Sequence, residues 1–87
     1  MTVERVTVVC FGAMRDYLPP DARANRASVE LPVGGSVADL IDALGAPRRL
    51  VFSVLVDGAQ AGIDEPLHDG AEVTLMPPFA GGAARSL

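Results

Sequence analysis

The sequence predicts an α+β fold of two layers, in which one amphipathic helix packs across a mixed β-sheet. Two observations favour this class: β-branched apolar runs lie near both ends of the chain, and a central segment has helical spacing between clear start and stop signals. The chain has 87 residues, of which 49% are hydrophobic and 21% charged, and that is enough to close one small core. We find no repeat, linker or domain boundary in it.

The first half of the chain contains two expected strands. Residues 5–12 (RVTVVCFG) are β-branched and apolar and end at a glycine, which is typical of a well-buried strand. Residues 27–31 (ASVEL) alternate, so that Val29 and Leu31 share one face and polar side chains occupy the other. Residues 13–26 hold two prolines and many polar residues, which predicts a turn or short helical piece followed by a loop.

The clearest element is a helix over about residues 36–44. Ser36 is the expected N-cap, Asp39 occupies the third helical position, and Gly45 followed by a proline ends the helix. Its apolar residues are spaced to form one stripe, which we expect to pack on the sheet: Val37, Leu40, Ile41 and Leu44.

Two further strands follow the helix. Residues 51–58 (VFSVLVDG) predict a strand closed by a turn at Asp57 and Gly58, and residues 71–78 (AEVTLMPP) predict a last strand that two prolines stop. A second Asp-Gly pair, at positions 69 and 70, marks the turn before that last strand. The expected order is therefore β, β, α, β, β, with two hairpin-like halves around the helix.

Charge and composition limit the classes of partner. The formal charge is −4 and the isoelectric point is about 4.6, which argues against nucleic acid, because a phosphate binder needs a basic face. An acidic protein is better suited to docking on a basic enzyme. No signal segment or membrane-length apolar run occurs, so we expect a cytoplasmic protein with no membrane partner. All seven basic residues are arginine.

The titratable residues do not suggest an enzyme active site. His68 lies in a turn (PLHDG), where we expect it to be solvated, and Cys10 is expected to be a buried strand residue that forms no internal disulfide. Arg15 is expected to form a structural ion pair with a carboxylate near the strand end, and exposure to solvent is the alternative. No cluster has the spacing of a metal site or of a nucleophile with its base, so we expect neither a bound cofactor nor an active site.

Two adjacent glycines, Gly81 and Gly82, stand five residues before the C-terminus. A glycine without a Cβ lets the backbone enter a narrow channel, and its carbonyl carbon is open to attack, so the pair can serve as a reactive end. Glycine near a chain end is also common in a frayed terminus, and the pair alone leaves both interpretations open.

Five segments occur in an ordered set: FGAMRD, SVADLIDALG, VLVDG, PLHDGAEVTLMPP and FAGG. With them, from Val6 to Gly82, the chain resembles the MoaD/ThiS family, the ubiquitin-like sulfur carriers with a β-grasp fold. The segment AMRD at 13–16 makes it more similar to the small subunit of molybdopterin synthase than to the shorter thiamine-pathway carrier. The resemblance implies one β-grasp domain over residues 1–82 and a C-terminal extension over 83–87.

The resemblance also implies a chemistry for Gly82. In the family, the carboxylate of the final glycine is adenylated with ATP by an enzyme of the ubiquitin-activating type and is then converted to a thiocarboxylate. The implied partners are that adenylating enzyme and the large subunit of molybdopterin synthase, or another sulfur-accepting enzyme. Molybdenum cofactor synthesis is the first pathway to consider, before the synthesis of thiamine, cysteine or a specialised metabolite.

Docking positions follow from the same resemblance. Phe11 and Met76 match apolar positions by which such carriers contact partner enzymes, and core packing is the alternative for both. Phe79 lies beyond the prolines and is harder to bury, which makes it the better candidate for an anchor. Gln60 stands where the synthase subunits more often have an apolar docking residue.

The last five residues, 83–87, depart from the family's free Gly-Gly end. An amide-linked Gly82 has no carboxylate to adenylate, so we expect a precursor whose tail a processing protease removes. The alternatives are a ubiquitin-like binding module that keeps its tail and has no sulfur chemistry, and a modifier that forms isopeptide bonds.

Overall fold

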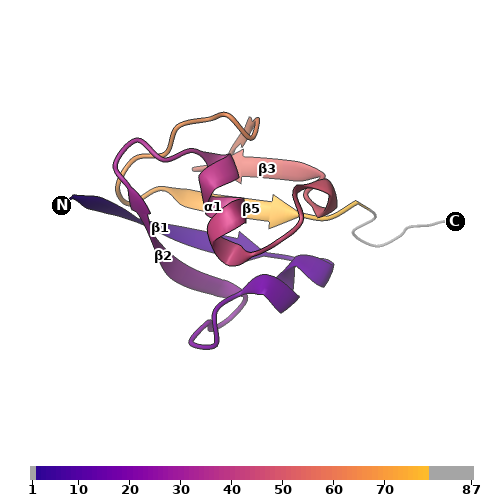
Figure 1. Ribbon diagram of the computed structural model, residues 1–87. Helices are drawn as coiled ribbons and strands as arrows, with labels where there is room; N and C mark the ends of the chain where they lie inside the picture. Colours follow the sequence, from indigo (N-terminus) through magenta and orange to yellow (C-terminus); the bar gives the residue numbers. More distant parts are fainter. Residues whose placement is uncertain (1, 79–87) are drawn as a thin grey trace, which may run out of the picture.

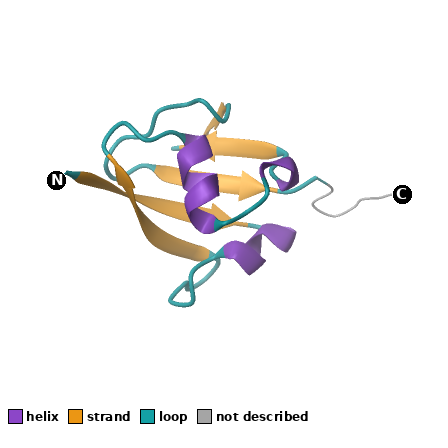
Figure 2. Cartoon of the chain, in the orientation of Figure 1, coloured by secondary structure: helices purple, strands orange, loops and turns teal. Residues whose placement is uncertain are grey.

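The computed structural model describes residues 2–78 and has the expected two layers, a mixed sheet with a helix across one face (Figures 1 and 2). The sheet has five strands in the order β2-β1-β5-β3-β4. Their bounds are Val3–Cys10 for β1, Arg26–Pro32 for β2, Ser53–Val56 for β3, Ala59–Ala61 for β4 and Glu72–Met76 for β5. The helix α1 covers Val37–Leu44, and short 3-10 helices cover Gly12–Tyr17 (η1) and Arg48–Leu50 (η2). The predicted α+β class is confirmed.

The first and last strands lie side by side in the middle of the sheet. β1 runs parallel to β5, with Cys10 paired to Leu75, and antiparallel to β2, with Val6 paired to Val29. On its other side β5 pairs antiparallel with β3. The C-terminal ends of β1 and β5 therefore lie at the same end of the sheet (Figure 1). The chain leaves β5 from the centre of the sheet, with a neighbouring strand on each side.

β4 is a strand that the sequence analysis missed. The predicted turn at Asp57 and Gly58 is present, with both residues at positive φ, 53° and 86°, which suits a two-residue hairpin. The turn leads directly back along β3, where Val56 pairs with Ala59. Two alanines and a glutamine have little strand propensity, so the geometry of the turn rather than composition forms this strand.

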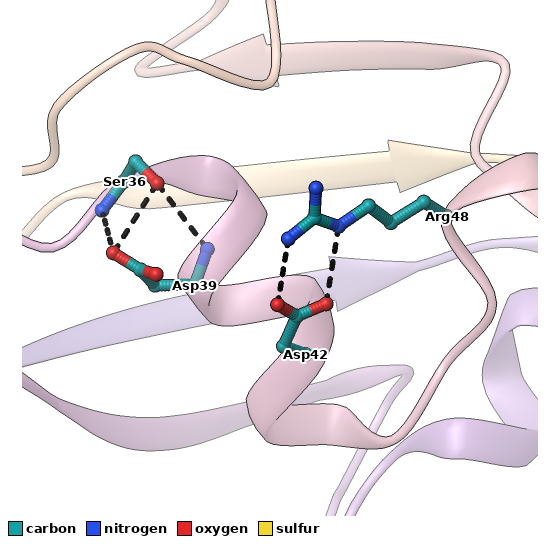
Figure 3. Close-up of polar contacts among 4 residues, drawn as sticks. All are labelled: Ser36, Asp39, Asp42 and Arg48. Carbon is teal, nitrogen blue, oxygen red and sulfur yellow. Dashed lines mark hydrogen bonds and ion pairs between the residues drawn. The ribbon is translucent and has the colours of Figure 1, made fainter.

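The helix α1 begins and ends where its caps were predicted. The Ser36 hydroxyl accepts a hydrogen bond from the Asp39 N–H, and the Asp39 carboxylate accepts one from the Ser36 N–H, which closes a capping box (Figure 3). Gly45 adopts a φ of 75° at the other end, a conformation that costs glycine little. Beyond it, Arg48 donates hydrogen bonds of 2.7 and 3.2 Å to the Asp42 carboxylate (Figure 3). Within residues 2–78 no helix is long and apolar enough to cross a membrane.

The core lies between α1 and the sheet. The stripe predicted for the helix faces it, with Leu40 and Ile41 fully buried and Leu44 partly covered. Alternate residues of the two central strands complete it, namely Val6, Val8 and Cys10 of β1 and Val73 and Leu75 of β5. Burial raises the pKa of the Cys10 thiol to about 11, so this cysteine is a packed core residue, as expected.

The segment after β1 is helical, one of the two forms that the sequence analysis allowed. Met14 anchors η1, since its side chain is fully buried in the core. The ion pair predicted for Arg15 is wrong as far as the described residues go, because its Nε donates instead to the backbone carbonyl of Gly12 at 3.2 Å. Arg15 therefore closes the first turn of its own short helix and does not join two segments.

Candidate functional site

The end of β5 is the point from which the chain runs toward the two glycines. β5 ends at Met76, as predicted, because Pro77 and Pro78 have no N–H with which to continue the ladder. Pro77 is buried and packs against Gly12, where an added Cβ would lie 2.9 Å from Pro77 Cγ. The direction in which the chain leaves the sheet is therefore held by packing as far as Pro77.

Phe11 and Met76, the two predicted docking positions in this part of the chain, are neighbours on the face of the sheet opposite α1. In β1 the buried residues Val8 and Cys10 face the helix, so the extended backbone at Phe11 directs its side chain to the other face. The parallel register of β1 and β5 ends with Cys10 opposite Leu75, and the Phe11 N–H still donates to the Leu75 carbonyl, so continuing it by one residue sets Phe11 beside Met76. Phe11 is 43% exposed and Met76 is half-buried, and neither belongs to the core cluster.

This face continues across the sheet as a row of cross-strand neighbours. Val9 pairs with Thr74 of β5, which pairs with Leu55 of β3. Leu55 in turn pairs with Gln60 of β4, an exposed residue at the end of the row. Gln60 therefore places its amide at the rim of the face and leaves the apolar centre intact. We term this surface the open face, formed by Phe11, Leu55, Thr74 and Met76 around the buried Val9.

Ion pairs border the open face on the side away from the end of β5. Arg26 of β2 reaches Glu72 of β5 at 2.9 Å, and Arg5 of β1 reaches Glu30 of β2 at 2.6 Å. All four side chains are about half exposed, between 46% and 64%, so the pairs add little to stability. Their effect is to confine the apolar surface to the end of the sheet from which the chain leaves.

Phe52 is a candidate that the sequence analysis did not identify. It directly precedes β3 and is 77% exposed. Its N–H donates to the carbonyl of Met76 at 2.8 Å, so it lies on the other side of the β5 end from Phe11, whose N–H donates to the Leu75 carbonyl at 3.2 Å. The sequence did carry a signal, because Val51 and Phe52 are adjacent. Successive side chains of an extended strand point to opposite faces, so the two cannot both face the same core.

The remaining predicted site residues lie outside the described residues. Phe79, Gly81 and Gly82 follow Pro78, and so does the extension over 83–87. Their predicted roles as anchor, reactive end and removable tail stay predictions. What the structure provides is the fixed starting point of that segment and the surface around it.

The expectation that His68 is merely solvated is wrong, although its side chain is 64% exposed. Its Nε2 lies 2.7 Å from the Asp57 carboxylate, and its Nδ1 lies 2.9 Å from the carbonyl oxygen of Asp69. Sequence spacing gave no sign of this contact, because Asp57 and His68 belong to different turns. Both turns are at the start of β5, far along the strand from the exit of the chain, so His68 is structural.

Comparisons with known proteins agree with this architecture. A family model described as Mut7-C ubiquitin matches residues 3–82. A search of curated proteins finds no match. Among solved structures, the chain is similar to the small archaeal modifier protein SAMP1 from Haloferax volcanii, with 25% identity, a TM-score of 0.67 and coverage of 90% of this chain and 99% of that one.

Two further similar structures are described as subunits of molybdopterin-converting factors. One, from Pyrococcus furiosus, is provisionally described as a molybdopterin converting factor subunit 1; it is 26% identical, with a TM-score of 0.65 and coverage of 87% of this chain and 99% of that one. The other is a complex of subunits 1 and 2 of the molybdopterin-converting factor from Helicobacter pylori, with 20% identity, a TM-score of 0.56 and coverage of 90% and 99%. At that identity the second shows the fold alone. The expected ubiquitin-like β-grasp fold is confirmed.

Proposed function

Because the chain belongs to the Mut7-C ubiquitin family, we propose that it is a ubiquitin-like sulfur carrier whose working residue is Gly82. The fold and the similar proteins support the broader class, a sulfur carrier or a ubiquitin-like modifier. In the proposed reaction Gly82, once it is the C-terminal residue, is adenylated and then converted to a thiocarboxylate. Sulfur passes from there to an acceptor enzyme, first of all in molybdenum cofactor synthesis.

The observation that carries the proposal is the position of β5. It is a central strand with a partner on both sides, and it ends in Pro77 and Pro78 just before the glycine pair. Phe79–Gly82 is a segment of four residues, which spans at most ~13–14 Å when fully extended. A short segment on a fixed base can present its end to another protein's active site, whereas a glycine pair on a long free tail could not be positioned so closely.

The proposed chemistry needs no catalytic group from this chain. The carboxylate oxygen of Gly82 attacks the α-phosphorus of ATP and releases pyrophosphate, which gives a mixed anhydride with AMP. A sulfur nucleophile of the partner system then attacks the Gly82 carbonyl carbon and releases AMP. Cys10 does not take part, because it is fully buried and its pKa is raised to about 11. The chain is thus a substrate of its partner enzymes.

The extension over 83–87 makes processing the first step of the proposal. In the uncut chain Gly82 is followed by Ala83, so its carbonyl belongs to an amide and it has no α-carboxylate. We propose that a protease, of the zinc metalloprotease class in similar systems, cuts after Gly82 and releases the residues that follow it. The cut both creates the reacting carboxylate and removes side chains that a narrow channel excludes.

We propose that the open face contacts the acceptor enzyme, for which the large subunit of molybdopterin synthase is the first candidate. Its apolar residues include Phe11 and Met76, which lie at the end of the sheet where β5 ends, and Gly82 follows four residues after Pro78 in the sequence. An acceptor that covers this face would bring its own active site close to the thiocarboxylate. The similarity to a molybdopterin converting factor subunit supports this pathway over the others.

The similarity to a small archaeal modifier protein favours a second candidate function. There the adenylated Gly82 carbonyl is attacked by an amine of a target protein, which forms an isopeptide bond and releases AMP. Both functions begin with the same adenylation, so they differ only in the nucleophile.

Mass spectrometry of the processed chain separates the two functions. The chain ending at Gly82 is incubated with ATP, a sulfur source and the ubiquitin-activating-type enzyme of its source organism. A carrier gains the mass of one oxygen-to-sulfur exchange. A modifier instead appears in covalent adducts with other proteins, each lighter by one water than the sum of its parts. If neither product forms and no pyrophosphate is released, the chain is a binding module without this chemistry.

A further inference from the structure

Of the large apolar side chains that the structure describes, Phe52 is the most exposed, at 77%. Its backbone is nevertheless fixed, because its N–H donates to the Met76 carbonyl at 2.8 Å and the next residue, Ser53, pairs with Met76 in the sheet. An exposed aromatic ring on a rigid base adds nothing to the core. It loses little conformational freedom when a partner covers it, which is the property of an interface anchor.

The reach of the terminal segment places Phe52 in the footprint of whichever enzyme reacts at Gly82. Four residues separate Pro78 from the Gly82 carboxylate, so an active site closed on that carboxylate lies within ~13–14 Å of Pro78. A protein that approaches so closely must cover the surface around the end of β5. Phe11 borders that end on the β1 side and Phe52 on the β3 side.

The charges near Phe52 indicate the character of the matching surface. Arg48 is paired with Asp42, but Arg49, three residues before Phe52, is exposed and forms no ion pair among residues 2–78. Of the acidic residues that dominate the net charge of −4, Asp42 is paired with Arg48, and two others lie at the opposite end of the sheet. These two are Asp57 and Asp69, in the turns that adjoin the start of β5.

We propose that Phe52 and Arg49 form a second anchor for the enzyme that adenylates Gly82, apart from the open face. The occupant is an apolar pocket of that enzyme with a carboxylate at its rim, where Phe52 inserts its ring and Arg49 pairs with the carboxylate. The proposal rests on the proposed function, since it names the surface by which the adenylating enzyme positions Gly82. It also reverses the expectation from net charge: at this point of contact the partner is acidic, not basic.

The test is steady-state ATP–pyrophosphate exchange by the adenylating enzyme of the source organism, with chains that end at Gly82. Phe52→Ser removes the ring and Arg49→Glu reverses the charge. Val33→Ser is the matched control, because Val33 is also an exposed apolar residue, at 58%, but follows β2 at the opposite end of the sheet. Thermal unfolding of each variant is followed by circular dichroism, and all three are expected to unfold like the parent.

We expect Phe52→Ser to raise the KM for the carrier at least about tenfold with little change in kcat, the size of effect that an aromatic anchor has. Arg49→Glu should raise the KM in the same direction, and Val33→Ser should leave it unchanged. If the parent is adenylated and Phe52→Ser has a KM within about twofold of it, the anchor is disproved while the carrier function stands. If the parent itself is not adenylated, the proposed function falls and the anchor with it.

Discussion

The imidazole Nε2 of His68 lies 2.7 Å from Oδ2 of Asp57, so the turn before β5 is joined to the turn after β3. The other Asp57 oxygen accepts the N–H of Glu72 at 2.9 Å, and Nδ1 of His68 lies 2.9 Å from the Asp69 carbonyl oxygen. Both partners of the ring are acceptors, so the doubly protonated imidazolium satisfies both contacts at once. Asp57 and His68 thereby connect the turn between β3 and β4 with the turn that precedes β5.

This contact makes stability depend on pH. The hydrogen bond to Asp57, followed by the Asp69 carbonyl, raises the pKa of His68 above its ordinary value of 6.5. The folded chain therefore binds this proton more tightly than the unfolded chain, and the gain is complete below the unfolded pKa and is lost as pH rises through the folded one. We expect the denaturation midpoint to fall as pH rises through that range above 6.5.

His68→Gln is the variant that checks this prediction, because it keeps a polar side chain and removes the titration. Its urea midpoint should vary less than that of the parent across the same pH range. Asp57 acts at the acidic end of the pH range. Its hydrogen bond from the Glu72 N–H, followed by the contact with His68, lowers its pKa below 3.8. Its contribution to stability is therefore present above the unfolded pKa and is lost as pH falls through the folded pKa. A parent midpoint that is flat above pH 6.5 would contradict the role given to His68.

Gly12→Ala should destabilise the chain. Gly12 has a φ of +56°, and an added Cβ would lie 2.9 Å from Pro77 Cγ, so the substitution combines backbone strain with a clash. Strain at positive φ alone costs about 1–3 kcal/mol. Gly62→Ala is the control, because Gly62 has no positive φ and no atom within 4 Å of the added Cβ. Urea denaturation measures both, and equal midpoints would show that Pro77 does not rest on Gly12.

Leu40→Ala should cost about 2–5 kcal/mol in the free energy of unfolding, because Leu40 is fully buried between α1 and the sheet. The measurement is the shift of the urea midpoint at constant slope. Ala43→Ser, on the exposed side of the same helix, should change the free energy by about 0.5 kcal/mol or less. If Leu40→Ala lowers the free energy of unfolding no more than Ala43→Ser does, Leu40 is not packed between α1 and the sheet as described.

Chain length should control adenylation if Gly82 is the working residue. The chain ending at Gly82 is expected to support pyrophosphate exchange, and the chain that continues to Leu87 is not. A chain ending at Gly81 also presents a glycine carboxylate but is shorter by up to ~3.3–3.6 Å, a displacement large enough to reduce the rate about a hundredfold or more. Equal activity of the chain that continues to Leu87 and the chain that ends at Gly82 would refute processing as a required step.

The sequence by itself determined the parts of this protein that depend on neighbours along the chain. The capping box of Ser36 and Asp39, the stop at Gly45 and the turn at Asp57 all follow from residues within a few positions of one another. The helical stripe and the strand alternation of β2 are likewise periodic signals, so the α+β class could be predicted. The ordered motifs ending in the glycine pair also pointed to a ubiquitin-like carrier before any tertiary contact was known.

Only the tertiary structure decided what depends on residues far apart in sequence. The parallel pairing of β1 with β5 brings Phe11 beside Met76, and the approach of two turns joins His68 to Asp57. Phe52 could not be separated from a core residue by its type, because its exposure depends on where the last turn before β3 places it. Local patterns specify elements at short range, whereas strand register and burial are settled only when the whole sheet closes. The surface around the end of β5 is built from such long-range contacts.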